Sequence, residues 1–178
     1  MAASLLLSLM LAILLVCPTN ARLSMKVTED VLKEICSPHE DPPFCLQVLN
    51  SDPRTPFVDL VGLTNISIHL ADVAINTTLA MIGPLVNETA DPKLKVQYDL
   101  CYQLYDSNVG EIELAKYGWK AGDYKKVVTM ASGCLTDCDD CSDAISIIAS
   151  SPLSQKNKEA FHYCETMLLV SKRLSGDM

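Results

Sequence analysis

Cysteine is the residue type in this sequence with the most chemistry open to it, because a thiol can act as a nucleophile, bind zinc or form a disulfide. Eight cysteines occur in 178 residues. Cys17 ends an apolar N-terminal run, and we expect it to be removed with that run. The other seven are Cys36, Cys45, Cys101, Cys134, Cys138, Cys141 and Cys164. In an oxidising compartment most of them are expected to pair.

Two pairs follow from chain geometry. Cys36 and Cys45 flank a proline-rich turn between two short helical segments, so a local disulfide is expected. In an antiparallel helical hairpin, facing residues lie equally far from the connecting turn. Cys101 and Cys141 lie equally far from Ala121-Gly122, which predicts that they face each other across that turn.

The remaining three cysteines leave alternatives open. Cys138 and Cys164 lie about equally far from Ser150-Ser151-Pro152, so a third disulfide is possible. Cys134 with Cys164 is a poorer fit, and Cys134 is our candidate for the odd thiol. A rival interpretation is a zinc site built from Cys134, Cys138, Cys141 and Cys164. The predicted secretion of the chain favours disulfides.

Catalytic chemistry is not indicated elsewhere. The three histidines, His39, His69 and His162, match no recognisable motif, and His162 lies two residues from Cys164, on a different helix face. The acidic run around Asp137 lacks the spacing and the central glycine of a calcium-binding loop. We therefore expect no enzyme activity, no cofactor and no metal.

Helical patterns account for nearly all of the remaining sequence. Two short segments, about 27–36 and 44–49, predict a hairpin. Four longer segments follow: one from after Pro56 to about Gly83-Pro84, one from Asp91-Pro92 to Ala121-Gly122, a third capped by Asp123, and a last one from about Gln155 to Leu174. Short connections predict an all-α fold, an antiparallel up-down four-helix bundle preceded by a short N-terminal helical hairpin and stapled by disulfides.

The first 21 residues are typical of a signal peptide, an apolar run broken by Pro18 and ending in small residues. We expect cleavage after Ala21, a single domain over residues 22–178, and no further apolar run long enough to span a membrane. The formal net charge of −8, with 22 acidic and 14 basic side chains spread along the chain, disfavours nucleic acid as a partner.

Four segments carry a resemblance to a known family: ICSPHEDPPFC, DLCYQLYDSNVGEIELA, AGDYKKVVTMASGCLTDCDDC and NKEAFHYCETMLLVSKRL. Together with the predicted order of elements, they resemble the plant invertase/pectin methylesterase inhibitor family over nearly the whole mature chain. In that family the first cysteine pairs with the second and the third with the fourth, which implies Cys36 with Cys45 and Cys101 with Cys141. Cys134 and Cys138 depart from the family pattern.

The resemblance implies a secreted, monomeric inhibitor in the apoplast or cell wall, rather than the vacuole, whose partner is pectin methylesterase or acid invertase. Invertase inhibitors of this family often carry Pro-Lys-Phe at the start of the third long helix, where this chain has Asp123-Tyr124-Lys125-Lys126. Pectin methylesterase is therefore slightly favoured. The four residues are candidate partner contacts, or a helix cap followed by a solvated face. The alternative function is a non-inhibitory storage, signalling or pollen-coat protein on the same scaffold.

Secretion would also give meaning to three glycosylation triplets, which begin at Asn65, Asn76 and Asn87. Asn65 and Asn76 are eleven residues apart, about three helical turns, so they can share one stripe of a helix. Glycans there would prevent a partner from docking on that stripe.

Overall fold

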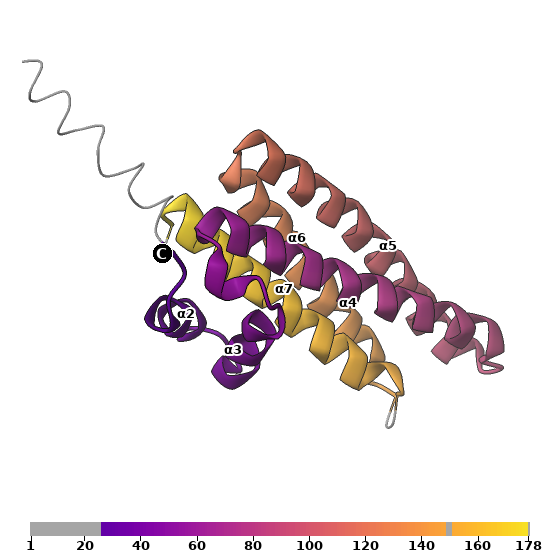
Figure 1. Cartoon of the computed structure of the whole chain (residues 1–178). Helices are drawn as coiled ribbons and strands as arrows, with labels where there is room; N and C mark the ends of the chain where they lie inside the picture. The colour runs from indigo at the N-terminus through magenta and orange to yellow at the C-terminus, as the bar shows by residue number, and fades with distance from the viewer. Residues whose placement is uncertain (1–25, 149–150, 178) are drawn as a thin grey trace, which may run out of the picture.

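The computed structural model describes residues 26–148 and 151–177, so the predicted signal peptide lies outside the described residues. The described chain is helical, apart from an isolated antiparallel bridge between Lys26 and Asp59. A helical hairpin and a short 3₁₀ turn precede four long helices (Figure 1). The elements are α2 (Glu29–Cys36), α3 (Pro42–Ser51), η1 (Thr55–Phe57), α4 (Leu60–Glu88), α5 (Pro92–Ala121), α6 (Tyr124–Ile145) and α7 (Leu153–Ser175). The expected fold class is confirmed.

The four long helices form a closed ring of neighbours. Each packs against the next along the chain, and α7 packs back against α4. Figure 1 shows the four running side by side, with α2 and α3 lying against one side of the bundle. The hairpin contacts α4, which follows it closely in sequence, and α7, at the far end of the chain.

Aspartates start three of the long helices, because a carboxylate accepts hydrogen bonds from the free amides of the first turn. Asp59 accepts from Gly62 N at 2.9 Å, Asp91 from Lys93 N at 2.8 Å and Asp123 from Lys126 N at 3.1 Å. Each cap is worth about 1 kcal/mol. Gly122 ends α5 with φ of 72°, a left-handed conformation that favours glycine.

Helix α4 is longer than the sequence predicts. We expected it to end near Gly83-Pro84, but it continues through Pro84 to Glu88. Proline removes the amide that would bond to the carbonyl of Ala80. Both Ala80 and Pro84 are exposed, so water can satisfy that carbonyl. The helix ends where Thr89 Oγ1 donates to Leu85 O at 2.6 Å.

The expectation that no further apolar run of membrane-spanning length follows the N-terminus is wrong by length and composition, since α4 is long and apolar enough to cross a membrane. In the structure, however, α4 is a bundle helix. Buried side chains along it, including Leu63, Ile68, Ile75 and Ile82, pack inside the protein. A core helix of a folded domain meets the same compositional test.

Two apolar clusters hold the chain together. The larger fills the bundle and includes Ile75, Tyr105, Ile112 and Met167. The smaller joins the hairpin to the bundle, and its members are Val27, Val31, Leu32, Ile35, Cys36, Cys45, Leu49, Leu60, Leu63, Leu169, Val170 and Leu174. Burying one aliphatic side chain of this size contributes about 1.5–3 kcal/mol. The smaller cluster is therefore the main attachment of the hairpin.

Candidate functional site

The four residues at the start of α6 that the sequence proposed as partner contacts lie in different environments. Asp123 is exposed and caps the helix through its bond to Lys126 N. Tyr124 is half-buried and packs against the hairpin cluster, which leaves less of its ring free to reach a partner. Lys125 is exposed. Lys126 is half-buried, with Nζ 5.1 Å from the ring centroid of Tyr117.

Tyr117 is one of the aromatic side chains that this end of the bundle presents to solvent, where Phe57, just before α4, is also exposed. Tyr117 lies on α5 and is 64% exposed, and Leu114, one turn earlier, is 45% exposed. Sequence reasoning did not single it out. Tyr117 and Lys126 lie equally far from the Gly122 turn, so the rule that paired Cys101 with Cys141 would also have found this pair.

Gly118 lets the two helices approach at this point. A Cβ atom on Gly118 would lie 3.2 Å from Cβ of Lys126 and 3.1 Å from the carbonyl oxygen of Asp123. Its own carbonyl accepts the amide of Asp123 at 2.9 Å. The close approach places the Lys126 ammonium over the Tyr117 ring. We call Tyr117, Lys120, Lys125 and Lys126 the turn patch.

A cleft of about 340 Å³ lies beside the turn patch, lined by Arg54, Asn65, Ile68, His69, Asp72, Lys116, Trp119 and Lys120. Its cations are largely neutralised. Arg54 pairs with Asp52, and Lys116 donates to Asp72 at 2.9 Å and to Glu113 at 2.6 Å. Trp119 Nε1 donates to the carbonyl of Val61 at 2.9 Å and so has a structural role. The cleft is therefore a poor anion site.

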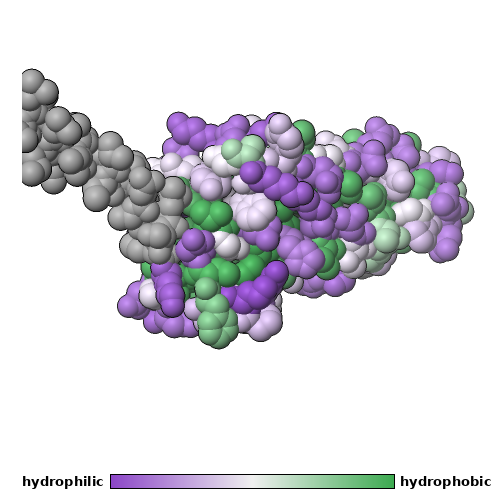
Figure 2. Space-filling view, turned by 45° about the horizontal axis from the view of Figure 1, so that its top comes forward, coloured by the Kyte–Doolittle hydropathy of each residue, from purple (hydrophilic) through white to green (hydrophobic). Residues whose placement is uncertain are grey.

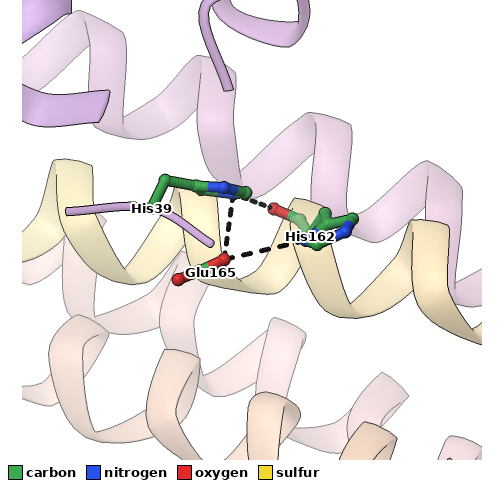
Figure 3. A group of neighbouring side chains, drawn as sticks. All are labelled: His39, His162 and Glu165. Atoms are coloured by element: carbon green, nitrogen blue, oxygen red, sulfur yellow. Dashed lines mark hydrogen bonds and ion pairs between the residues drawn. The ribbon is translucent and has the colours of Figure 1, made fainter. Parts of the chain in front are cut away.

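A buried polar group joins the hairpin turn to α7 (Figure 3). His39 Nε2 lies 3.1 Å from the carbonyl oxygen of His162 and 3.2 Å from Glu165 Oε2. The other oxygen of Glu165 accepts the amide of Glu40 at 3.0 Å. His162 Nδ1 lies 3.7 Å from Glu165 Oε2. The side chain of Glu165 thus lies between the turn and the helix.

These three side chains offer the donor types of a zinc site, with ligand atoms all within 4.8 Å of one another. The hydrogen bonds of His39 decide against it. Its Nδ1 accepts the amide of Asp41 at 2.9 Å, and its Nε2 faces a carbonyl, which can only accept. The ring proton is therefore on Nε2, and the nitrogen that faces Glu165 has no lone pair to offer a metal.

The sequence model of the family described as "Plant invertase/pectin methylesterase inhibitor" matches residues 30–170. This chain belongs to that family. The family is one of enzyme inhibitors. The match covers both short helices of the hairpin and most of α7, so the hairpin and the bundle are one family unit.

Proteins named as pectinesterase inhibitors and proteins named as invertase inhibitors are both similar to this chain. A protein named "Pectinesterase inhibitor" from Actinidia deliciosa is 34% identical over 176 residues, covering 98% of this chain and 95% of its own. A "Putative invertase inhibitor" from Platanus orientalis is 27% identical over 158 residues, covering 84% and 93%. The crystal structure of a mutant pectin methylesterase inhibitor from Arabidopsis superimposes with a TM-score of 0.72 at 24% identity, over 79% of this chain and 95% of that one. That superposition shows the shared fold.

The inhibitor-family chain has two disulfides, Cys36 to Cys45 and Cys101 to Cys141. These are the pairs that the turn geometry and the resemblance both predict. The first closes the hairpin on itself, and the second links α5 to α6. Cys141 is therefore unavailable to the four-cysteine zinc site that we considered as a rival.

The possible third disulfide, Cys138 to Cys164, is not formed. Cys134, Cys138 and Cys164 are buried free thiols, so Cys134 is one of three rather than the odd one out. The Cys138 thiol also contacts α5, with Sγ 3.8 Å from the hydroxyl of Tyr105. Hydrogen bonds with Cys134 and Cys138, together with burial, raise the pKa of Cys164 well above its usual value. A thiol with a raised pKa is a poor nucleophile.

Next to these thiols, a network of buried hydrogen bonds connects α5, α6 and α7. The Tyr105 hydroxyl donates to Asn157 Oδ1 at 2.9 Å, and Asn157 Nδ2 donates to the carbonyl of Cys138 at 2.9 Å. Burial and the neighbouring thiols raise the pKa of Tyr105 far above its usual value. Tyr105 thus stays neutral, and the network fixes the register of α5, α6 and α7.

The three glycosylation triplets lie on or near α4, at positions of different exposure. Asn65 is half-buried in the cleft described above. Asn76 is exposed and donates to Asp72 through its own Nδ2, the atom that a glycan would occupy. Asn87 is exposed in the last turn of the helix. Asn87 is therefore the exposed acceptor for which no such side-chain hydrogen bond is seen among the described residues.

Proposed function

We propose that this protein inhibits a pectin methylesterase by docking on it and blocking access to its active site. The observation that carries the proposal is the 34% identity to a pectinesterase inhibitor over 98% of this chain. The relatives named as invertase inhibitors match at lower identity, 27%. The Asp-Tyr-Lys-Lys start of α6, in place of Pro-Lys-Phe, also supports pectin methylesterase over acid invertase.

The turn patch is the part of the surface that we propose as the main docking contact. Tyrosine is enriched among the residues that dominate binding energy, because it buries a large rigid ring and keeps a polar tip. The ring of Tyr117 is largely exposed and is supported from one side by Lys126. Lys120 follows Tyr117 by three residues on α5 and Lys125 precedes Lys126 on α6, and both are exposed.

The charges of the turn patch suit an enzyme surface that carries carboxylates. The protein as a whole has a formal net charge of −8, so this basic end contrasts with the rest of the molecule. Charge complementarity of this kind increases the association rate and selects the orientation of docking. Figure 2 shows, on the face that it presents, apolar and hydrophilic side chains interspersed along the bundle and a larger apolar area beside the hairpin. The interspersed pattern along the bundle favours a specific docking site there over an extended hydrophobic interface.

Inhibition is tested by titrating a purified pectin methylesterase and a purified acid invertase with the oxidised protein lacking residues 1–21, at mildly acidic pH. We expect stoichiometric loss of pectin methylesterase activity and little loss of invertase activity. Loss of invertase activity alone would reverse the choice of target. If neither enzyme is inhibited, the non-inhibitory alternative on the same scaffold takes its place.

The docking surface is tested with Tyr117→Ala and a matched control on the same helix, Tyr102→Ala, whose ring is 41% exposed. Losing a buried aromatic anchor costs about 2 kcal/mol or more in binding, which is about a 30-fold rise in the inhibition constant. We expect this rise for Tyr117→Ala and less than twofold for the control. Equal effects of the two substitutions would contradict the turn patch. Lys125→Glu should mainly slow association and increase its salt sensitivity.

The inhibitor proposal also includes the secretion of the protein, the bounds of its domain and its oligomeric state. Residues 1–21 are proposed as a signal peptide and residues 22–178 as a single inhibitor domain that acts as a monomer outside the cell. N-terminal sequencing of the secreted protein, expected to begin at Arg22, tests the first point. Digestion with an N-glycosidase, with Asn87→Gln as the comparison, tests glycan attachment at the accessible acceptor.

A further inference from the structure

Two carboxyl groups meet a buried amide in the middle of the α5–α6 interface. Asn108 on α5 is fully buried. With its NH₂ group turned toward the two acids, the Asn108 amide donates to Glu111 Oε2 and Asp137 Oδ2, each at 3.2 Å, when they are ionised. With its Oδ1 toward them, it can accept a hydrogen bond from a protonated carboxyl group. Glu111 lies on α5 and Asp137 on α6, so one amide bridges acids from both helices.

The carboxyl group of Glu111 occupies a space that Gly133 leaves open. A Cβ atom on Gly133 would lie 2.0 Å from Oε1 and 2.6 Å from Cδ of Glu111. These distances are far below van der Waals contact, so no other residue type at position 133 accommodates this carboxyl group where it lies. The acid is therefore built into the interface rather than extended into solvent.

Among the described residues, the groups that influence this pair include no cation. Glu111 is influenced by Asp137 and by the thiol of Cys134, and Asp137 by Ser107 on α5 and Asp140 on α6. From α7, the thiol of Cys164 reaches Cys134. Two negative charges held partly out of water, next to each other and without a counter-ion, destabilise the interface.

Burial is the largest influence on both acids, and it raises the pKa of Glu111 and of Asp137. The charge of Asp137 raises the pKa of Glu111 further, and the charge of Asp140 does the same for Asp137. The folded protein therefore holds protons on these groups more tightly than the unfolded chain does. When the folded state binds more protons, its stability falls as the pH rises through the acidic range.

We propose that Glu111 and Asp137 form a proton-binding site that tightens the α5–α6 interface in mildly acidic solution and loosens it toward neutral pH. The site is independent of which enzyme the protein binds. It lies on the two helices that carry the turn patch, so proton release changes the rigidity of the elements that present that patch. Other acids of the protein behave in the opposite way. Asp52 and Glu159, each bonded to a cation, have lowered pKa values.

The test is chemical denaturation of the oxidised protein between pH 4.5 and 7.5, comparing wild type with Glu111→Gln, Asp137→Asn and the control Asp139→Asn. Asp139 is exposed on α6, and its substitution removes the same unit of charge as the other two. We expect the unfolding constant of wild type and of the control to rise severalfold from pH 5 to pH 7.5. The Glu111→Gln and Asp137→Asn variants should show a much smaller rise.

Hydrogen exchange locates the effect within the fold. After correction for intrinsic rates, amides of residues 108–112 and 133–138 should exchange faster at pH 7.5 than at pH 5 in wild type but not in Glu111→Gln. The proposal is overturned if Glu111→Gln and Asp137→Asn keep the wild-type pH dependence. It is also overturned if calcium stabilises the protein and a chelator reverses this, because the pair would then hold a cation in place of a proton.

Discussion

The bundle and the hairpin of this protein are stabilised in different ways. The α5–α6 pair of the bundle is closed by a two-residue turn, a disulfide and a buried polar network. The hairpin has its own disulfide, but among the described residues no covalent bond joins it to the bundle. It is attached by an apolar cluster and by a few polar contacts to α7. The α5–α6 pair is thus closed by neighbours in sequence, whereas the polar contacts of the hairpin turn reach residues more than 120 positions away.

The comparison predicts that the two disulfides contribute unequally to stability. The Cys101–Cys141 bond closes a separation of 40 residues and the Cys36–Cys45 bond one of 9. Chain entropy then gives about 4 kcal/mol for the first and about 2.6 kcal/mol for the second. Urea denaturation of the double variants Cys101→Ala/Cys141→Ala and Cys36→Ala/Cys45→Ala measures both. A greater loss from the hairpin pair would break the comparison.

A smaller effect is expected from the polar contacts between the hairpin and α7. The side chain of Glu165 is 16% exposed and accepts from the hairpin turn, whereas that of Glu34 is 55% exposed and pairs with Arg173 at 2.9 Å. Glu165→Ala removes the acceptor of the Glu40 amide and the carboxylate that faces the buried His39 ring, and it should cost about 1–2 kcal/mol.

Glu34→Ala is the matched control, and it should cost less than about 0.5 kcal/mol because exposed ion pairs contribute little. Hydrogen exchange of residues 37–45 checks both variants, since faster exchange should be confined to the hairpin in Glu165→Ala. Faster exchange throughout the bundle would show that the two regions unfold together.

The smallest effect concerns the connection between the two regions. Asp52 follows α3, and its hydrogen bonds from Arg54 lower its pKa from the model-compound value of 3.8 to about 2. An acid with a lowered pKa contributes stability above its unfolded value, and this contribution is lost as the pH falls from about 4 to about 2. Asp52→Asn should therefore lower the melting temperature by about 2 °C at neutral pH.

The same measurement near pH 2 supplies the control for Asp52→Asn. There the wild-type carboxyl is itself becoming protonated, so the difference between the two proteins should shrink. A difference that stays constant down to pH 2 would mean that Asp52 acts through its turn hydrogen bonds and not through its charge.

Local rules in the sequence determined most of the fold. Helical periodicity, the aspartate caps and the Gly122 turn predicted the four long helices, and the equal distances from that turn predicted the Cys101–Cys141 bond. Each of these depends on residues that are close in sequence or related by one short turn. The predicted end of α4 was wrong because a proline is tolerated on the exposed face of a helix. Whether Ala80 and Pro84 are exposed depends on how the helix packs, which local sequence does not determine.

Only the tertiary structure decided which side chains meet across longer distances. The sequence showed no motif that includes His39 or His162 and did not single out Glu165, and packing of the hairpin on α7 brought the three together. It also offered Cys138 and Cys164 as a possible disulfide, but in the structure both are free thiols, and Cys138 Sγ also contacts the hydroxyl of Tyr105. Asn108, Glu111 and Asp137 became one site only when α5 and α6 packed side by side. Sequence patterns determine local conformation, whereas the relative rotation of helices depends on the whole set of packed side chains.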